Sequence, residues 1–323
     1  MNAHPHIVVL DGYTLNPGDN SWDDVAALGQ FTVFDRTADQ DILDRAGEAD
    51  IILTNKTPLT RQTIEALPRL RMIAVLATGY DVVDIVAAKE RGIVVCNVPV
   101  YSTDSVAQFV MACILDHVRR IDVHDAACKS GDWTKNADFS FWLTNQIELT
   151  GKTLGIVGFG RIGAKTAELG HGLGMNILAY APRPKPAPAY TGFAFAETID
   201  ALFETADIIS LHCPLTADNK GFVDARLLDR MKKEALFINT ARGALVNEED
   251  LAAALSAGTI SGAYLDVLGV EPPPASHPLL HAPRCRVTPH VAWATLAARQ
   301  RLMATTAQNI KAFLAGTPQN QIV

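Results

Sequence analysis

The stretch TLGIVGFGRIG, residues 153–163, decides the fold of this chain. It reads as an apolar strand that runs into a glycine-rich turn and then opens a helix. In such a turn Gly158 permits a sharp reversal, Gly160 lets a pyrophosphate approach the backbone, and Gly163 lets the helix pack closely on the strand. The N-terminus of the helix carries a partial positive charge that favours phosphates. We therefore predict a dinucleotide site, rather than a merely structural turn, formed by Gly158, Phe159, Gly160, Arg161, Ile162 and Gly163.

The next strand pattern, residues 175–180, lacks the acid that usually binds the adenosine ribose of NAD. Ala181 stands where that acid is expected, and Arg183 and Lys185 follow closely. Without a carboxylate a 2′-phosphate is not repelled, and an arginine can bind it. We expect NADP(H) to be preferred to NAD(H), or both forms to be accepted. The alternative is that Arg183 only decorates a proline-rich surface loop.

Short apolar runs alternate with helical patterns on both sides of the glycine-rich turn. The runs are continuous, which is typical of strands buried on both faces of a parallel sheet. We predict an α/β protein with two doubly wound parallel-sheet domains and a cleft between them. The strands expected in the two series cover residues 7–10, 31–35, 51–55, 72–78 and 93–98, then 153–160, 175–180, 207–213, 235–241, 263–268 and 285–290.

The length of 323 residues suits two domains. A formal net charge of −7 disfavours nucleic acid and anionic membranes as partners. No apolar run approaches the roughly 18–20 residues that a bilayer span needs. The N-terminus lacks the pattern of a signal peptide, and we assign no metal site. We expect a soluble cytoplasmic protein.

The domain boundary is expected near residues 98–105, where Pro99 breaks a strand and good N-cap residues follow. One apolar stripe then predicts a helix of about 25 residues that ends near Lys129 and is about 37 Å long. Such a helix either connects the domains or forms a subunit interface. A last helix, 295–315, is expected to return to the first domain. The predicted domains are 1–100 plus 295–323, and 101–294.

Residues 131–150 show no clear periodicity but carry the aromatic residues Trp133, Phe139, Phe141 and Trp142. Aromatic side chains on an irregular segment need a surface that covers them. We expect this segment to be an arm that mediates dimerisation. The alternative is that it folds onto its own chain.

A cation, an acid and an imidazole follow three successive predicted strands of the second series: Arg242, Glu271 and His290. Because open α/β sheets bind ligands at the carboxyl ends of their strands, we expect these side chains to converge. His290 suits a general acid, Glu271 stabilises the charged imidazole, and Arg242 binds a carboxylate and polarises a carbonyl. Each residue alone is better interpreted as structural, but their shared placement favours chemistry on a 2-keto acid.

The first domain offers a candidate site for the substrate carboxylate. Ala77, Thr78 and Gly79 follow a predicted strand, and the glycine permits a tight turn that exposes backbone N–H groups. Asn55 and Lys56 occupy an equivalent strand end and are expected to add a donor. Lys56 suits a plain surface charge equally well.

With these motifs assembled, the chain resembles the D-isomer-specific 2-hydroxyacid dehydrogenases, most closely the glycerate dehydrogenases, also called hydroxypyruvate reductases. The segments that carry the resemblance span essentially the whole chain and include LTNKTPLT, LATGYDVVD, GKTLGIVGFGRIG, FINTARGALV, LDVLGVEPPP and TPHVAWAT. The resemblance implies a discontinuous flavodoxin-like substrate domain, a Rossmann cofactor domain and a homodimer. It also implies NAD(P)H-dependent reduction of hydroxypyruvate to D-glycerate and of glyoxylate to glycolate.

The resemblance also implies roles for single residues. Arg242, Glu271 and His290 align with the catalytic residues of the family, and Gly79 lies in its substrate loop. Asp266 aligns with a residue that contacts the nicotinamide amide, and Trp142 is placed to reach the substrate pocket of the neighbouring subunit. The residues implied to line the cofactor cleft are Cys213, Pro214 and Thr240.

Several alternatives remain at this point. One is a related 2-ketoacid reductase of the same family with another substrate. Formate dehydrogenases pair the histidine with Gln, so Glu271 argues against them, and phosphoglycerate dehydrogenases often append a regulatory domain for which there is no room. A non-enzymatic, dinucleotide-sensing corepressor can keep the triad, although the chain shows no basic or disordered interaction tail.

Overall fold

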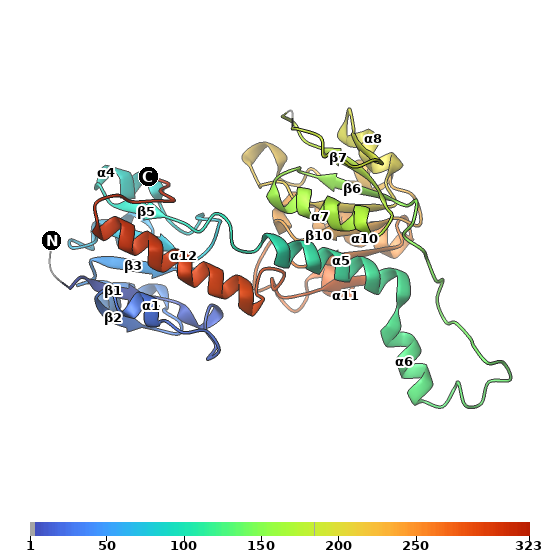
Figure 1. The fold of residues 1–323 in the computed structure, drawn as a ribbon, viewed down its shortest axis with the longest axis horizontal. Helices are drawn as coiled ribbons and strands as arrows, with labels where there is room; N and C mark the ends of the chain where they lie inside the picture. Colours follow the sequence, from blue (N-terminus) through green and yellow to red (C-terminus); the bar gives the residue numbers. More distant parts are fainter. Residues whose placement is uncertain (1–3, 184) are drawn as a thin grey trace. The chain divides into compact units, whose positions relative to one another are not determined.

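The computed structural model describes residues 4–183 and 185–323. The chain divides into two compact units (Figure 1). The first unit combines Met1–Ser102 with Ala294–Val323, and the second unit is Thr103–Trp293. No helix in the described part of the chain is long and apolar enough to cross a bilayer.

The first unit is built on a parallel sheet of five strands in the order β2-β1-β3-β4-β5, as in flavodoxin. The strands are β1 (His6–Val9), β2 (Gln30–Val33), β3 (Ile51–Thr54), β4 (Met72–Val75) and β5 (Val94–Cys96). The helical segments are η1 (Gly12–Thr14), α1 (Asp23–Ala26), η2 (Asp39–Asp41), α2 (Ile42–Ala46), α3 (Arg61–Glu65), α4 (Ile85–Glu90) and α12 (Leu296–Leu314). Helix α12 packs against β4 and α1, and the last residues bond to β5, so both ends of the chain belong to this unit.

The second unit is built on a parallel sheet of seven strands in the order β12-β11-β10-β9-β6-β7-β8. Its strands are β6 (Thr153–Val157), β7 (Asn176–Tyr180), β8 (Phe193–Phe195), β9 (Ile208–Leu211), β10 (Leu236–Asn239), β11 (Gly262–Leu265) and β12 (Cys285–Val287). Because the order reverses between β6 and β9, this is the Rossmann arrangement, whose ligand site lies at that reversal. The prediction of an α/β protein with two doubly wound parallel sheets is confirmed.

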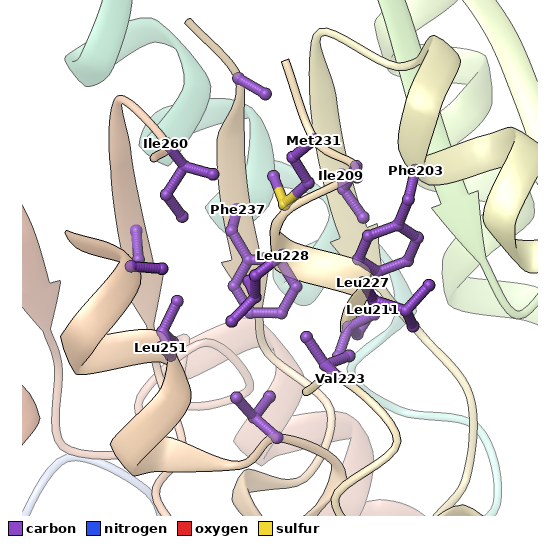
Figure 2. Packing of buried hydrophobic residues seen from close by; sticks show 14 of the residues in the cluster. Phe203, Ile209, Leu211, Val223, Leu227, Leu228, Met231, Phe237, Leu251 and Ile260 are labelled. Carbon is purple, nitrogen blue, oxygen red and sulfur yellow. The ribbon is translucent and has the colours of Figure 1, made fainter. Parts of the chain in front are cut away.

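Helices cover both faces of the larger sheet. Apolar side chains of α5 and α7 pack on one face, and those of α8 to α11 pack on the other. On the second face Phe237 of β10 meets Leu228 and the side chains around it in a closely packed cluster (Figure 2). The helical segments are α5 (Thr103–Arg119), α6 (Ile121–Lys129), α7 (Arg161–Gly172), α8 (Ile199–Thr205), η3 (Ala217–Asn219), α9 (Ala225–Leu228), η4 (Gly243–Leu245), α10 (Glu248–Ala257) and α11 (Pro278–His281).

The prediction of one continuous helix up to Lys129 is wrong. The helix breaks at Arg120, whose backbone is left-handed with φ of 44°, and α6 leaves in a new direction (Figure 1). Arg286, a residue of β12, stabilises this break. Its guanidinium binds Asp116 of α5 and Asp122 of α6, at 3.0 Å each. The apolar stripe continues across the break, so the pattern alone does not reveal it.

The expectation that all strands are buried on both faces also needs correction. Strand β2 lies at the edge of the smaller sheet and is partly exposed along its length. Strand β8, which forms the other edge of the larger sheet, was not predicted, because its sequence FAF contains no β-branched residue. Edge strands have one neighbour rather than two, which relaxes the need for a continuous apolar run.

The segment after α6 forms an extended arm, drawn in green in Figure 1. The arm returns to β6 without regular structure, and its aromatic side chains are open to solvent: Trp133 is 54% exposed, Phe139 89% and Trp142 72%. Leu143 is bound to α6, because its backbone N–H donates to Nε2 of His124 at 3.1 Å. The described chain therefore leaves these rings uncovered.

Candidate active site

His290 and Glu271 form a hydrogen-bonded pair beyond the carboxyl ends of β12 and β11. Nδ1 of His290 lies 2.7 Å from Oε2 of Glu271, and both side chains are partly exposed. A carboxylate only accepts hydrogen bonds, so Nδ1 carries the hydrogen and donates it. Nε2 of His290 has no hydrogen-bond partner among the described residues, and it is thus available to a substrate. The pair that the sequence predicted is therefore present, although its catalytic role stays a prediction.

The backbone of His290 is held in an unusual conformation. Its φ of 54° lies in the left-handed region, which is uncommon for residues other than glycine, and such conformations cluster at functional sites. Asp266 holds the surrounding turn, because its carboxylate accepts the N–H groups of Val291 and Ala292 at 2.8 Å and the hydroxyl of Thr288 at 2.7 Å. Burial raises the pKa of Asp266, and these bonds oppose the rise.

Asp266 also has a structural role, which the resemblance did not indicate. The side chain is 2% exposed, and its carboxylate oxygens are engaged by three donors of the chain itself. The geometry makes Asp266 the residue that fixes the turn carrying His290. Contact with a nicotinamide amide stays a prediction.

Arg242 follows β10, the neighbour of β11 in the sheet. Its Nη1 donates to the carbonyl of Ala241 at 2.8 Å, and no carboxylate pairs with it in the described part of the chain. Asn239 shapes the turn by accepting from the N–H of Ala241 and donating to the carbonyl of Arg242. An arginine without a carboxylate partner, at the carboxyl edge of a parallel sheet, can bind an anion with its fork.

Gly243 connects the Arg242 turn to the segment that carries Glu271, and sequence reasoning missed it. A Cβ atom built on Gly243 would overlap the carbonyl carbon of Leu268 and the amide of Gly269. Only glycine therefore lets the two backbones touch. The loop 268–271 is also closed internally, because Oε1 of Glu271 accepts the N–H of Leu268 at 3.1 Å. The signal available in the sequence was a glycine directly after the arginine.

The glycine-rich turn has the features that a dinucleotide needs. Gly158 has φ of +99°, and a Cβ there would lie 2.5 Å from the amide nitrogen of Cys213. A Cβ on Gly163 would overlap the carbonyl of Gly158, so the helix can approach the strand only without a side chain. Gly160, in contrast, faces open space at the N-terminus of α7. A pyrophosphate fits such an uncovered helix end.

The other predicted cofactor residues lie around the same reversal of strand order. The hydroxyl of Thr240 is buried and has no partner within the described chain, which suits a ligand that supplies one. Cys213 and Pro214 follow β9, and burial raises the pKa of the Cys213 thiol to about 11. Arg183 is exposed beyond β7, and no ion pair holds it in the described chain. The residues present therefore fit a dinucleotide.

The three residues of the predicted turn that are not glycine differ in where their side chains lie. The ring of Phe159 packs against Phe193 and Phe195 of β8, at centroid distances of 5.2 and 5.5 Å. Arg161 is exposed at the first residue of α7, and Ile162 is partly buried. Phe159 thus ties the glycine-rich turn to the edge of the sheet.

In the first unit, the turn 77–79 presents unused backbone N–H groups. Its other polar groups are fixed: Thr78 donates its hydroxyl to the carbonyl of Val98 at 2.8 Å, and its own carbonyl accepts from Asn97 at 2.7 Å. The carbonyl of Ala77 accepts from the N–H of Val98. The backbone N–H groups of residues 77–79 have no acceptor among the described residues. Such a set of N–H groups is suited to bind an anion.

Asp11 fixes the other predicted substrate loop, and sequence reasoning missed it. Its carboxylate accepts the N–H groups of Asn55 and Thr57 at 2.8 Å each, and also that of Lys56. The side chain of Asn55 is buried and donates to the hydroxyl of Thr14 at 2.9 Å, so it serves the loop itself. Lys56 is exposed on this loop. An acid directly after the first strand was the available signal.

A family model for the NAD binding domain of D-isomer specific 2-hydroxyacid dehydrogenases matches residues 111–292. The chain belongs to this family. A hydroxypyruvate reductase from Blautia hydrogenotrophica is 43% identical over 98% of this chain and 99% of its own. A glycerate dehydrogenase from Methylorubrum extorquens is 40% identical over 88% of both chains.

A solved structure extends the family likeness to the whole fold. An NADPH-dependent glyoxylate/hydroxypyruvate reductase from Sinorhizobium meliloti, in complex with NADP and malonate, superimposes with a TM-score of 0.82. It is 27% identical, and the match covers 99% of this chain and 97% of that one. As a 2-hydroxyacid dehydrogenase, the chain is an NAD(P)-dependent oxidoreductase that acts on small 2-keto and 2-hydroxy acids.

Proposed function

We propose that this 2-hydroxyacid dehydrogenase reduces hydroxypyruvate to D-glycerate and glyoxylate to glycolate, with NADPH preferred to NADH. The observation that carries the proposal is the 2.7 Å bond between His290 and Glu271, which leaves Nε2 of His290 available for proton donation. The curated relatives named hydroxypyruvate reductase and glycerate dehydrogenase support the substrate class.

The proposed roles follow from the geometry of each residue. A bound reduced nicotinamide dinucleotide supplies a hydride. His290 donates the proton on Nε2 to the carbonyl oxygen of the substrate, and Glu271 stabilises the imidazolium before the transfer. Arg242 binds the substrate carboxylate and polarises its carbonyl. The N–H groups of residues 77–79 and the ammonium of Lys56 supply further donors to the carboxylate.

The direct test is a panel of hydroxypyruvate, glyoxylate, pyruvate and phenylpyruvate, each assayed with NADPH and NADH by absorbance of the reduced nicotinamide. We expect the highest kcat/KM for hydroxypyruvate, followed by glyoxylate. A higher value for pyruvate or phenylpyruvate would instead identify a related reductase. Dinucleotide binding without turnover of any acid would favour the non-enzymatic corepressor.

Cofactor choice is expected to depend on the end of β7. The change Ala181→Asp places a carboxylate beside the proposed 2′-phosphate position and lowers kcat/KM for NADPH by about tenfold or more, equivalent to about 1.4 kcal/mol. The kcat/KM of this variant for NADH stays within about twofold of the wild-type value. Arg183→Ala is expected to lower kcat/KM for NADPH alone. Arg226→Ala, which removes a surface arginine paired with Asp200, serves as the control. A wild-type preference for NADH of tenfold or more would contradict this assignment.

We also propose that the arm 131–150 mediates a homodimer. Its exposed aromatic rings, and Ile121 of α6 at 73% exposure, are apolar side chains that a second copy can bury. Trp142 is then the residue proposed to reach the substrate of the neighbouring subunit. Light scattering of the wild type and of Phe139→Asp tests the dimer, which the variant is expected to weaken.

A further inference from the structure

Glu248 lies beside the loop that carries Glu271 but outside the proposed chemistry. It is the first residue of α10, and its side chain is only 21% exposed. Its Oε1 accepts the N–H of Gly269 at 2.8 Å. A Cβ on Gly269 would lie 2.8 Å from Oε2 of Glu248, so the loop approaches this carboxylate as closely as a glycine permits.

The other carboxylate oxygen of Glu248 is held by His277. Nε2 of His277 lies 3.2 Å from Oε2 of Glu248, and the imidazole is almost fully buried. Nδ1 of His277 accepts the N–H of Leu279 at 3.3 Å, which leaves the hydrogen on Nε2 to be donated to Glu248. Both oxygens of Glu248 are therefore engaged, one by the loop and one by the residue that caps α11.

The loop 268–271 is in this way fixed by a chain of contacts that ends at His290. Glu248 accepts the N–H of Gly269, and Oε1 of Glu271 accepts the N–H of Leu268. Oε2 of Glu271 in turn accepts from Nδ1 of His290. A carboxylate can orient an imidazole only if its own position is fixed, as second-layer partners do for metal-bound histidines. Without Glu248, the loop loses the side-chain acceptor that holds Gly269.

We propose that Glu248 is a positioning residue, held in turn by His277, which keeps Glu271 in hydrogen-bonding register with His290. The proposal rests on the proposed roles of Glu271 and His290. It assigns no contact between Glu248 and the substrate or cofactor. It predicts that loss of Glu248 reproduces part of the effect of losing Glu271.

The test compares Glu248→Ala and Glu248→Gln with Glu249→Gln. Glu249 is the next residue of the same helix and is exposed, and no side chain or backbone group of the described chain pairs with its carboxylate. It therefore controls for the change of charge. The first readout needs no turnover: the low-field proton resonance of the Nδ1–H of His290, assigned by its absence in His290→Asn. We expect this signal in the wild type and in Glu249→Gln, and its loss or weakening in both Glu248 variants.

The second readout is the pH dependence of kcat for reduction. Both Glu248 variants are expected to lower kcat by about tenfold. They are also expected to move the alkaline limb of the pH profile of kcat to lower pH, as expected for Glu271→Gln. The double variant Glu248→Ala/Glu271→Gln shows no further shift beyond Glu271→Gln, because both changes act on one interaction. A lower melting temperature of the Glu248 variants, with the Nδ1–H resonance of His290 and the alkaline limb of the kcat profile both unchanged, would overturn the proposal.

The two readouts also separate this proposal from the proposed function. Absence of turnover in the wild type refutes the function but leaves the resonance experiment decisive for Glu248. If Glu248→Ala does not fold, Glu248→Gln answers the question alone. Its amide replaces one of the two acceptor oxygens by an NH2 donor, so either Gly269 or His277 loses its acceptor. Full retention of the resonance in Glu248→Gln, together with an unmoved limb, contradicts the proposal.

Discussion

The change His290→Asn is expected to lower kcat for hydroxypyruvate reduction by about 10²- to 10⁴-fold, the usual contribution of a positioned general acid. Asparagine is the suitable replacement because it tolerates the left-handed backbone found at His290. The variant removes the proton donor without adding backbone strain. Steady-state kinetics measure the loss, and fluorescence titration with the reduced dinucleotide is expected to show an unchanged Kd.

His281→Asn serves as the control for this experiment. His281 is an exposed histidine of α11, and its Nε2 is bound to the carbonyl of Ala275 rather than left available. Its replacement is expected to leave kcat within about twofold. Retention of kcat in His290→Asn would show that another group protonates the substrate. Loss of dinucleotide affinity together with kcat would show that His290 is structural.

The change Arg242→Ala is expected to lower kcat/KM by about 10²- to 10³-fold, corresponding to roughly two charge-assisted hydrogen bonds. Much of the loss is expected in KM, because the carboxylate is bound before and during the reaction. Arg242→Lys keeps the charge but not the planar fork, so it recovers only part of the activity. The matched control is Arg230→Ala, a surface arginine paired with Glu204.

Chemical rescue sharpens this prediction. Added guanidinium ion is expected to restore part of the activity of Arg242→Ala and none of that of His290→Asn, because only the first variant lacks this cation. Equal KM values for the wild type and Arg242→Ala would contradict the role in carboxylate binding. Full activity of Arg242→Lys would show that charge alone is sufficient.

Much of the fold was predictable because its signals are local. The glycine-rich turn between strand and helix patterns, and the continuous apolar runs, were sufficient to predict two parallel sheets. The break at Arg120 was not predictable in this way. It depends on Arg286, which lies far away in the sequence and binds acids on both sides of the break. Strand β8 was missed because its sequence FAF contains no β-branched residue, unlike the equally short edge strand β12.

The candidate site shows the same division. The placement of Glu271 and His290 after successive strands predicted a pair that the structure brings to hydrogen-bonding distance. Asp11 and Glu248, in contrast, act by accepting backbone N–H groups from distant segments. No spacing rule connects an acid to the loop that it holds. Such residues become visible only when the folded chain places them together.

The pH dependence of kcat for reduction in Glu271→Gln tests the central claim most directly. The claim is that the carboxylate of Glu271 keeps the imidazole of His290 protonated until the substrate takes the proton. The change to glutamine removes the negative charge that favours the protonated imidazole. The account predicts that the alkaline limb of the kcat profile moves to lower pH in the variant. Superimposable profiles for the wild type and Glu271→Gln, with Glu249→Gln as the charge control, would contradict the account.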